Sequence, residues 1–244
     1  MPRTLISVLV MGLAGLAAWA QETVPVAGSR PADPSKPDLW KLLTDCQAKY
    51  RKVNDYTATF QKQERIAGKL TPVHLMSLEF RKPLSVHLVW RDGSFKGCEA
   101  LYVAGKYDGK LLVYLGHLGS FRKVMKLDPQ GVEALRGSSH SIGQAGVGHL
   151  LERMVEQFEN ARAAGTLRTE DPTQEEIDGR KTWRVMRVLE DGGRRVWNID
   201  QELMLPTRVT TRDKEGQLVE SFVYTDVKVN PGLRDEDFDP DVLW

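Results

Sequence analysis

The segment from residue 75 to residue 114 constrains the fold of this chain more than any other stretch. It has apolar side chains at every second position, namely Leu78, Phe80, Val86, Leu88 and Trp90. Because side chains two apart in a strand share a face, this pattern predicts one apolar side of an antiparallel meander. Pro83 and Asp92-Gly93 interrupt the pattern where strands should end. Such a sheet has an apolar face that other elements must cover.

Two amphipathic helices are predicted before and after this meander. Residues 38–53 carry Leu39, Leu42, Leu43, Cys46, Tyr50 and Val53 at helical spacing, and residues 146–164 carry Val147, Leu150, Leu151, Met154, Val155 and Phe158. Further strands are predicted at 56–65, 120–127, 166–177, 181–190, 194–200, 205–212 and 217–229. An antiparallel sheet of about ten strands tends to curl. We therefore expect an α+β fold, an incomplete barrel with both helices packed on its concave side.

The first 20 residues have the pattern of a signal peptide. Arg3 precedes an apolar run, and Ala18-Trp19-Ala20 forms a small-residue cleavage site. The run is too short to span a bilayer comfortably. We expect export to the periplasm or secretion after cleavage near Ala20, with a retained N-terminal anchor as the alternative. Residues 21–37, with four prolines, predict a flexible leader, and residues 38–244 a single domain.

The charge balance excludes a strong electrostatic partner. The chain has 34 basic and 33 acidic residues, and loss of the leader removes Arg3, which leaves 33 of each. A neutral chain has no large attraction for nucleic acid, so we expect none as a partner. We expect the protein to be a monomer.

The two cysteines of the mature chain leave two readings open. Cys46 and Cys98 could form a disulfide in an oxidising compartment, or both could be buried free thiols. A catalytic thiol is disfavoured because Cys46 lies on the apolar stripe of a predicted helix.

Several local motifs resemble the lipoprotein-carrier fold of LolA and LolB, and more closely an uncharacterised family of exported bacterial proteins in that superfamily. They are Cys46 to Tyr50, Asp55 to Phe60, Phe80 to Pro83, Val86 to Trp90, Glu99 to Tyr114, His140 to Leu151, Leu205 to Thr207 and Tyr224 to Asn230. The resemblance implies an apolar cavity that shields acyl chains. The Gly/Ser-rich segment 128–149 departs from the carriers' lid region.

An apolar ligand would need inward-facing side chains that the core does not use. Candidates are Phe60, Leu78, Phe80, Leu88, Trp90, Tyr102, Trp183, Trp197 and Phe222, with core packing as the alternative for each. Segment 128–149 is expected to act as lid or entrance, and Arg136, His140 and the helix start at Gly146 are candidates for binding an anionic headgroup. The alternative for the glycines is a turn that lets the helix pack closely.

No enzyme or metal site is predicted from the remaining motifs. The five histidines lack metal-ligand spacing, Ser139 and His140 adjoin without a nucleophile-elbow motif, and no cofactor motif is present. We expect a non-catalytic protein that holds a lipid, an acylated ligand or another apolar ligand. The alternative is a structural or protein-interaction module of the cell envelope with a filled barrel.

Overall fold

The computed structural model describes residues 36–116 and 124–243. The predicted signal peptide, nearly all of the leader and part of the strand predicted at 120–127 lie outside these residues. The described chain forms one open antiparallel sheet of 13 strands with two α-helices, so the predicted α+β incomplete barrel is confirmed. Within the described ranges, no helix is long and apolar enough to cross a membrane.

The elements follow the predicted order. The helices are α1 (Leu39–Arg51) and α2 (Val147–Ala163). The strands are β1 (Asp55–Ile66), β2 (Lys69–Leu70), β3 (His74–Arg81), β4 (Ser85–Trp90), β5 (Cys98–Val103), β6 (Leu111–Leu115), β7 (Val124–Leu127), β8 (Arg168–Thr169), β9 (Thr173–Ile177), β10 (Arg180–Val188), β11 (Arg194–Asp200), β12 (Leu205–Arg212) and β13 (Leu218–Val229).

The strand count exceeds the prediction for local reasons. The strand predicted at 166–177 is two strands, β8 and β9, separated by Glu170, Asp171 and Pro172, and both pair with β10. Proline lacks the N–H that a continuous ladder needs, so the strand divides there. Lys69 and Leu70, which lie between the strand predicted at 56–65 and the meander that begins at residue 75, add the short strand β2 beside β1.

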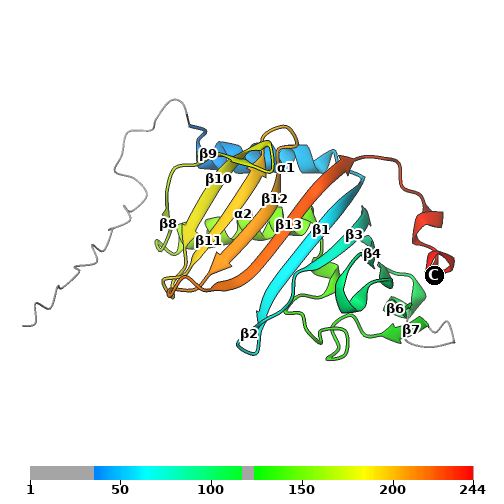
Figure 1. Cartoon of the computed structure of the whole chain (residues 1–244). Helices are drawn as coiled ribbons and strands as arrows, with labels where there is room; N and C mark the ends of the chain where they lie inside the picture. The colour runs from blue at the N-terminus through cyan, green and yellow to red at the C-terminus, as the bar shows by residue number, and fades with distance from the viewer. Residues whose placement is uncertain (1–35, 117–123, 244) are drawn as a thin grey trace, which may run out of the picture.

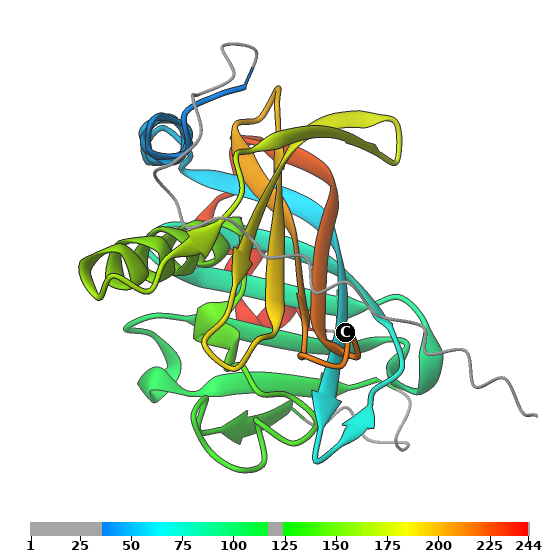
Figure 2. The ribbon, with the colours of Figure 1, turned by 90° about the vertical axis from the view of Figure 1, so that its left-hand side faces the viewer.

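The sheet bends around the two helices. Its order is β7-β6-β5-β4-β3-β1-β13-β12-β11-β10-β8, so the first and last parts of the chain meet at the β1–β13 pair (Figure 1). Figure 2 shows that the half containing β3–β7 turns away from the half containing β10–β13, with α1 and α2 on the inner side of the bend. Both helices pack against β12, and the half containing β3–β7 is left with less helical cover.

Two tyrosines of the sheet hold the start of α2. The Tyr224 hydroxyl accepts a hydrogen bond from Gly146 N at 3.0 Å, and the Tyr56 hydroxyl accepts one from Val147 N at 3.0 Å. These N–H groups lack partners within the helix, and Gly146 has no side chain to cap them. The sheet therefore supplies the cap of α2 and fixes the helix over the concave face.

Two glycines make this close approach possible. Gly146 has φ +103°, and a Cβ there would overlap the Tyr56 hydroxyl. A Cβ at Gly148 would overlap the ring and hydroxyl of Tyr50 on α1. The glycines thus let α2 pack against the sheet and against α1, which is the close-packing alternative considered for this segment.

We predict that Gly146→Ala lowers the free energy of unfolding by about 2–4 kcal/mol, because it adds both backbone strain and a steric overlap with Tyr56. Chemical denaturation would measure this loss. Gly165→Ala is the control, since Gly165 also has a positive φ but open space around its Cβ position. It should cost only about 1 kcal/mol. Equal losses in the two variants would contradict the capping arrangement.

Candidate functional site

A cavity of about 800 Å³ opens on the concave side of the sheet. Its apolar wall comes mainly from β3–β7 and from the concave faces of β1 and β11–β13. This wall includes Phe60, Met76, Leu88, Trp90, Ala100, Leu111, Val113, Met125, Leu127, Leu150, Trp197, Val209, Phe222 and Tyr224. Residues from the segment 133–145 and from α2 complete the lining. The inside of the barrel is therefore only partly filled by the helices.

The mouth of the cavity is bordered by exposed apolar side chains. In the part of the chain that the structure describes, the large hydrophobic residues classed as exposed are Leu70, Val73, Phe95 and Val132. Phe95 lines the cavity, and each of the other three adjoins a residue that does. Exposed apolar groups around an opening are typical of sites that take up apolar ligands or contact a partner.

Five of the nine aromatic and aliphatic candidates lie in the cavity wall. These are Phe60, Leu88, Trp90, Trp197 and Phe222. The other four, Leu78, Phe80, Tyr102 and Trp183, are absent from the lining. Phe80, for example, stacks on Tyr56 at 4.9 Å between ring centroids, which is the core-packing role considered as its alternative.

Of the three residues predicted to bind an anionic headgroup, two line the cavity and one does not. Arg136 and His140 line the cavity, whereas Gly146 does not. The Gly146 N–H is occupied by the Tyr224 hydroxyl and the next N–H by Tyr56. These two N–H groups are therefore already bonded to the sheet, and neither is free to bind an anion.

Both cysteines are buried free thiols in this structure. Cys46 lies on the inward face of α1, and burial together with the nearby Asp45 charge raises the pKa of its thiol to about 12. Cys98 lines the cavity from β5, and burial raises the pKa of its thiol as well. Neither is poised as a thiolate nucleophile.

A row of polar side chains crosses the concave face beside the aromatic wall. Strand pairing places Glu64 opposite Glu220, Glu220 opposite Thr211, and Thr211 opposite Arg195. Paired residues share a face, so this row runs across β1, β13, β12 and β11. It lies two residues from Phe222, Val209 and Trp197, which form the neighbouring apolar row. One end of the cavity is therefore polar and the other apolar.

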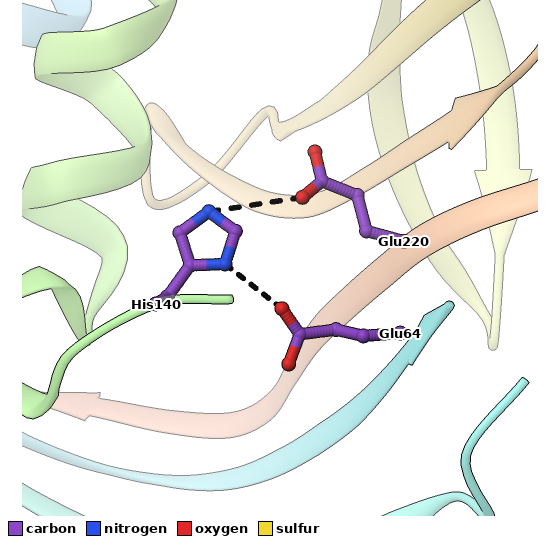
Figure 3. A group of neighbouring side chains, drawn as sticks. All are labelled: Glu64, His140 and Glu220. Atoms are coloured by element: carbon purple, nitrogen blue, oxygen red, sulfur yellow. Dashed lines mark hydrogen bonds and ion pairs between the residues drawn. The ribbon is translucent and has the colours of Figure 1, made fainter. Parts of the chain in front are cut away.

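His140 joins the two carboxylates of this row (Figure 3). Its Nδ1 lies 2.9 Å from Glu64 Oε1, and its Nε2 lies 3.7 Å from Glu220 Oε2. The ring also meets Phe222 edge to face, with 5.2 Å between centroids. The imidazole thus stands at the boundary between the polar and apolar walls.

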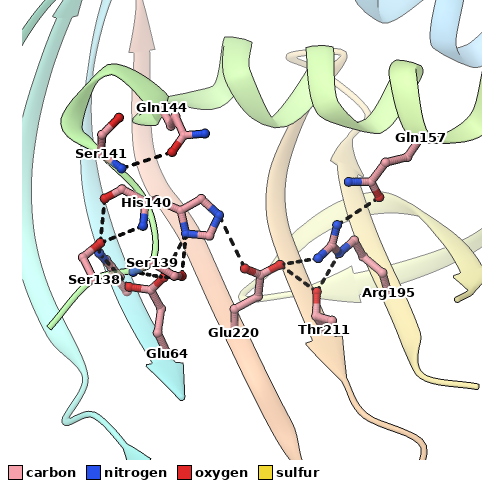
Figure 4. Close-up of polar contacts among 11 residues, drawn as sticks. Glu64, Ser138, Ser139, His140, Ser141, Gln144, Gln157, Arg195, Thr211 and Glu220 are labelled. Carbon is pink, nitrogen blue, oxygen red and sulfur yellow. Dashed lines mark hydrogen bonds and ion pairs between the residues drawn. The ribbon is translucent and has the colours of Figure 1, made fainter. Parts of the chain in front are cut away.

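Each carboxylate also has a cationic partner. Lys62 Nζ lies 2.8 Å from Glu64 Oε2, and Arg195 donates to Glu220 Oε1 at 2.8 Å. Thr211 donates to the same Glu220 oxygen at 2.8 Å, and Arg195 also donates to Gln157 of α2 at 2.9 Å. Figure 4 shows this network linking the sheet, the segment before α2 and α2 itself.

Glu64 is strongly stabilised as a carboxylate. Burial by itself would raise the pKa of its carboxyl, but hydrogen bonds from His140, Lys62 and Ser139 and the charge of Lys62 outweigh burial. Together they lower the pKa from 4.5 to about 2. Glu64 therefore remains ionised through the physiological range and holds the segment 138–140 against β1.

Ser139, His140 and Glu64 do not have the geometry of a catalytic triad. Ser139 Oγ and Glu64 Oε1 both lie at His140 Nδ1, at 3.0 and 2.9 Å, and the Ser139 hydroxyl donates a hydrogen bond to Glu64 Oε1. In a triad the serine and the acid bind opposite ring nitrogens, so that the base can accept the serine proton. Here the Nε2 side faces Glu220 instead.

Glu64, His140 and Glu220 are also the group whose atoms could ligate a metal ion, since one donor atom from each lies within 4.8 Å of the others. Lys62 and Arg195 already neutralise the two carboxylates. A divalent cation would have to displace or repel both of these charges. The donor set therefore fits a hydrogen-bonded network better than a metal centre.

Sequence reasoning missed Glu64, Glu220 and Arg195 as site residues. The sequence does contain a signal for them, because each lies on the same strand face as a predicted inward aromatic residue. Glu64 is four residues from Phe60, Glu220 two from Phe222, and Arg195 two from Trp197. What the alternation does not give is the register that places these charged ends side by side.

A comparison of the sequence with models of protein families assigns the chain to a family of unknown function. A family model described as "Protein of unknown function (DUF1571)" matches residues 53–242. The chain belongs to the DUF1571 family. No curated protein sequence matches it.

Three solved structures illustrate what this DUF1571 chain is similar to. One is a putative outer membrane lipoprotein-sorting protein domain from Vibrio parahaemolyticus, with 14% identity, coverage of 83% of this chain and 97% of that chain, and a TM-score of 0.40. Another is the LolA superfamily protein NE2245 from Nitrosomonas europaea, with 12% identity, coverage of 83% and 98%, and a TM-score of 0.39. The MucA/MucB complex of Pseudomonas aeruginosa gives 17% identity, coverage of 83% and 61%, and a TM-score of 0.46.

The Glu64 network predicts acid sensitivity. Because the folded-state pKa of Glu64 lies below its unfolded value, its contribution is present above about pH 4.5 and is lost as the pH falls toward 2. The pKa difference corresponds to at most about 3 kcal/mol. Glu64→Gln should therefore be less stable at neutral pH and show a flatter loss of stability between pH 5 and 2.

Urea denaturation at a series of pH values would measure this difference. Glu215→Gln, at the exposed turn between β12 and β13, is the control and should keep the wild-type pH dependence. An unchanged slope in Glu64→Gln would show that the ionised carboxylate does not stabilise the site.

Proposed function

We propose that this protein is an exported, non-catalytic binding protein that holds the acyl chain of a lipid or acylated ligand in its half-barrel. The observation that carries the proposal is the open cavity of about 800 Å³, whose wall is largely aromatic and aliphatic. This volume lies within the range typical of small-molecule sites, which are mostly apolar with a few placed polar groups. Each CH₂ group buried there would contribute about 0.8 kcal/mol.

The mouth supports uptake and release of such a ligand. Segment 133–145, which lines one side of the opening, would act as the entrance, while Phe95 and the β1–β3 connection would form the other side. In the cell envelope, such a protein would carry its ligand between membranes or proteins. Release to a protein partner is part of this proposal, with Leu70, Val73 and Val132 as exposed contacts.

The cavity also weighs against the alternative of a filled structural module. A barrel that serves only as a scaffold would be expected to pack its interior to the density of a protein core. The arrangement around His140 supports binding rather than hydrolysis, because Ser139 and Glu64 share one ring nitrogen.

Lipid binding can be tested with the mature protein purified without detergent. Native mass spectrometry should detect co-purified lipid, and the delipidated protein should bind a fluorescent acyl probe. We predict that Trp90→Glu weakens probe binding by at least about tenfold, because it places a charge in the apolar wall.

Trp183→Glu is the matched control. Both tryptophans are partly buried, but only Trp90 lines the cavity. Circular dichroism would show whether both variants remain folded. A wild-type protein with no bound lipid and no uptake of the probe would overturn the proposal, as would equal effects of the two substitutions in folded protein.

A further inference from the structure

The polar end of the cavity carries more positive than negative charge. Arg153 and Arg195 line the cavity, and Arg187 pairs with Arg195 across β10 and β11, so that the two side chains share the concave face. The carboxylate within this group is Glu220. With Lys62 and Glu64 paired beside it, four cationic side chains face two carboxylates.

The extra cations are not neutralised elsewhere in the described residues. Neither Arg153 nor Arg187 lies within 4.0 Å of a carboxylate of residues 36–116 or 124–243, where Arg195 is the arginine paired with Glu220. Glu152 and Glu156, the acidic residues on either side of Arg153 along α2, are both exposed to solvent. Glu220 already accepts hydrogen bonds from Arg195 and Thr211. It cannot also balance the remaining guanidinium groups.

Two buried nitrogen atoms here also lack hydrogen-bond partners. Arg187 is only 8% exposed, and its Nε is buried without a partner. His149 lines the cavity from α2, and its Nε2 is likewise buried and unpartnered. A buried charge or polar group without a partner is costly, so such groups need a water molecule, an ion or a ligand group to complete them.

The spacing along α2 gathers these groups at one place. His149, Arg153 and Gln157 are four residues apart, which puts them on one face of the helix, and all three line the cavity. Gln157 accepts a hydrogen bond from Arg195 Nη1 at 2.9 Å, so this helical face lies against the β11 end of the polar row (Figure 4).

The cations repel one another, and this repulsion lowers the pKa values of Arg195 and His149. Burial lowers the pKa of the Arg195 guanidinium, and the charges of Arg153 and Arg187 lower it further, against the opposing effect of Glu220. Burial and Arg153 likewise lower the pKa of His149. A bound anion would relieve this repulsion.

We propose that Arg153, Arg195 and His149 form a subsite for a phosphate or carboxylate group. Arg187, which pairs with Arg195 across β10 and β11, would add its positive charge to this subsite. This inference rests on the proposed acyl-binding function and names the class of ligand: an amphiphile whose tail lies along the aromatic wall and whose anionic headgroup lies at the polar end. Arginine suits this role because the N–H groups of its planar guanidinium can donate two hydrogen bonds to the oxygens of a phosphate or a carboxylate.

The test compares ligands that differ only in the headgroup. Hexadecyl phosphate, heptadecanoate and hexadecanol, each titrated into delipidated protein, share one hexadecyl tail, and inorganic phosphate tests the headgroup alone. We expect the two anionic amphiphiles to bind at least about tenfold more tightly than hexadecanol, the gain typical of charge-assisted hydrogen bonds. This preference should shrink as salt concentration rises.

Arg153→Gln should abolish most of the preference for the anionic amphiphiles over hexadecanol, because it removes one of the cations that would bind the headgroup. Arg184→Gln is the matched control: it lies on β10, its guanidinium is 3.7 Å from Glu170, and it does not line the cavity. It should behave as wild type.

Equal binding of hexadecanol and the anionic amphiphiles would overturn the headgroup subsite but leave the acyl-binding function standing. Failure of all three amphiphiles, with inorganic phosphate bound and its binding lost in Arg153→Gln, would overturn the acyl-binding function but keep an anion site. No binding by any probe would overturn both.

Discussion

The whole architecture depends on a sheet that is wider than its helices can cover. Eleven strands follow one another along the main path of the sheet, and at roughly 4.8 Å per strand they span about 50 Å. Two helices, each about 10 Å across, cannot cover this width. They pack over the half that includes β12, so the apolar faces of β3–β7 keep open space in front of them. The cavity is the consequence of this mismatch.

The position of α2 decides where that space begins. Its first N–H groups are held by hydroxyls of Tyr56 and Tyr224, which stand in neighbouring strands, and glycines at 146 and 148 remove the side chains that would block this approach. The same anchoring presents one face of α2, with His149, Arg153 and Gln157, to the cavity. One local capping arrangement therefore fixes both the core and the lining of the site.

Apolar and charged side chains occupy different parts of the inward face of the same strands. Inward positions near the middle of β1, β11 and β13 are aromatic, and those two or four residues further along are charged. Buried charges need partners, and Lys62, Glu64, His140, Glu220 and Arg195 largely supply them for one another. The result is an amphipathic cavity, which is the shape and chemistry that an amphiphile with a long tail requires.

The sequence by itself determined the two helices, most of the strands, the inward faces and the curled α+β sheet, because each follows from a local period of 3.6 or 2. It also indicated Phe60, Leu88, Trp90, Trp197 and Phe222 as inward-facing residues. Only the tertiary structure decided that these border open space while Leu78 and Phe80 fill the core, since that depends on where the helices stop. Only the strand register brought Glu64 and Glu220, from opposite ends of the domain, to His140. Register between distant strands is set by the packing of the complete sheet, and no local pattern encodes it.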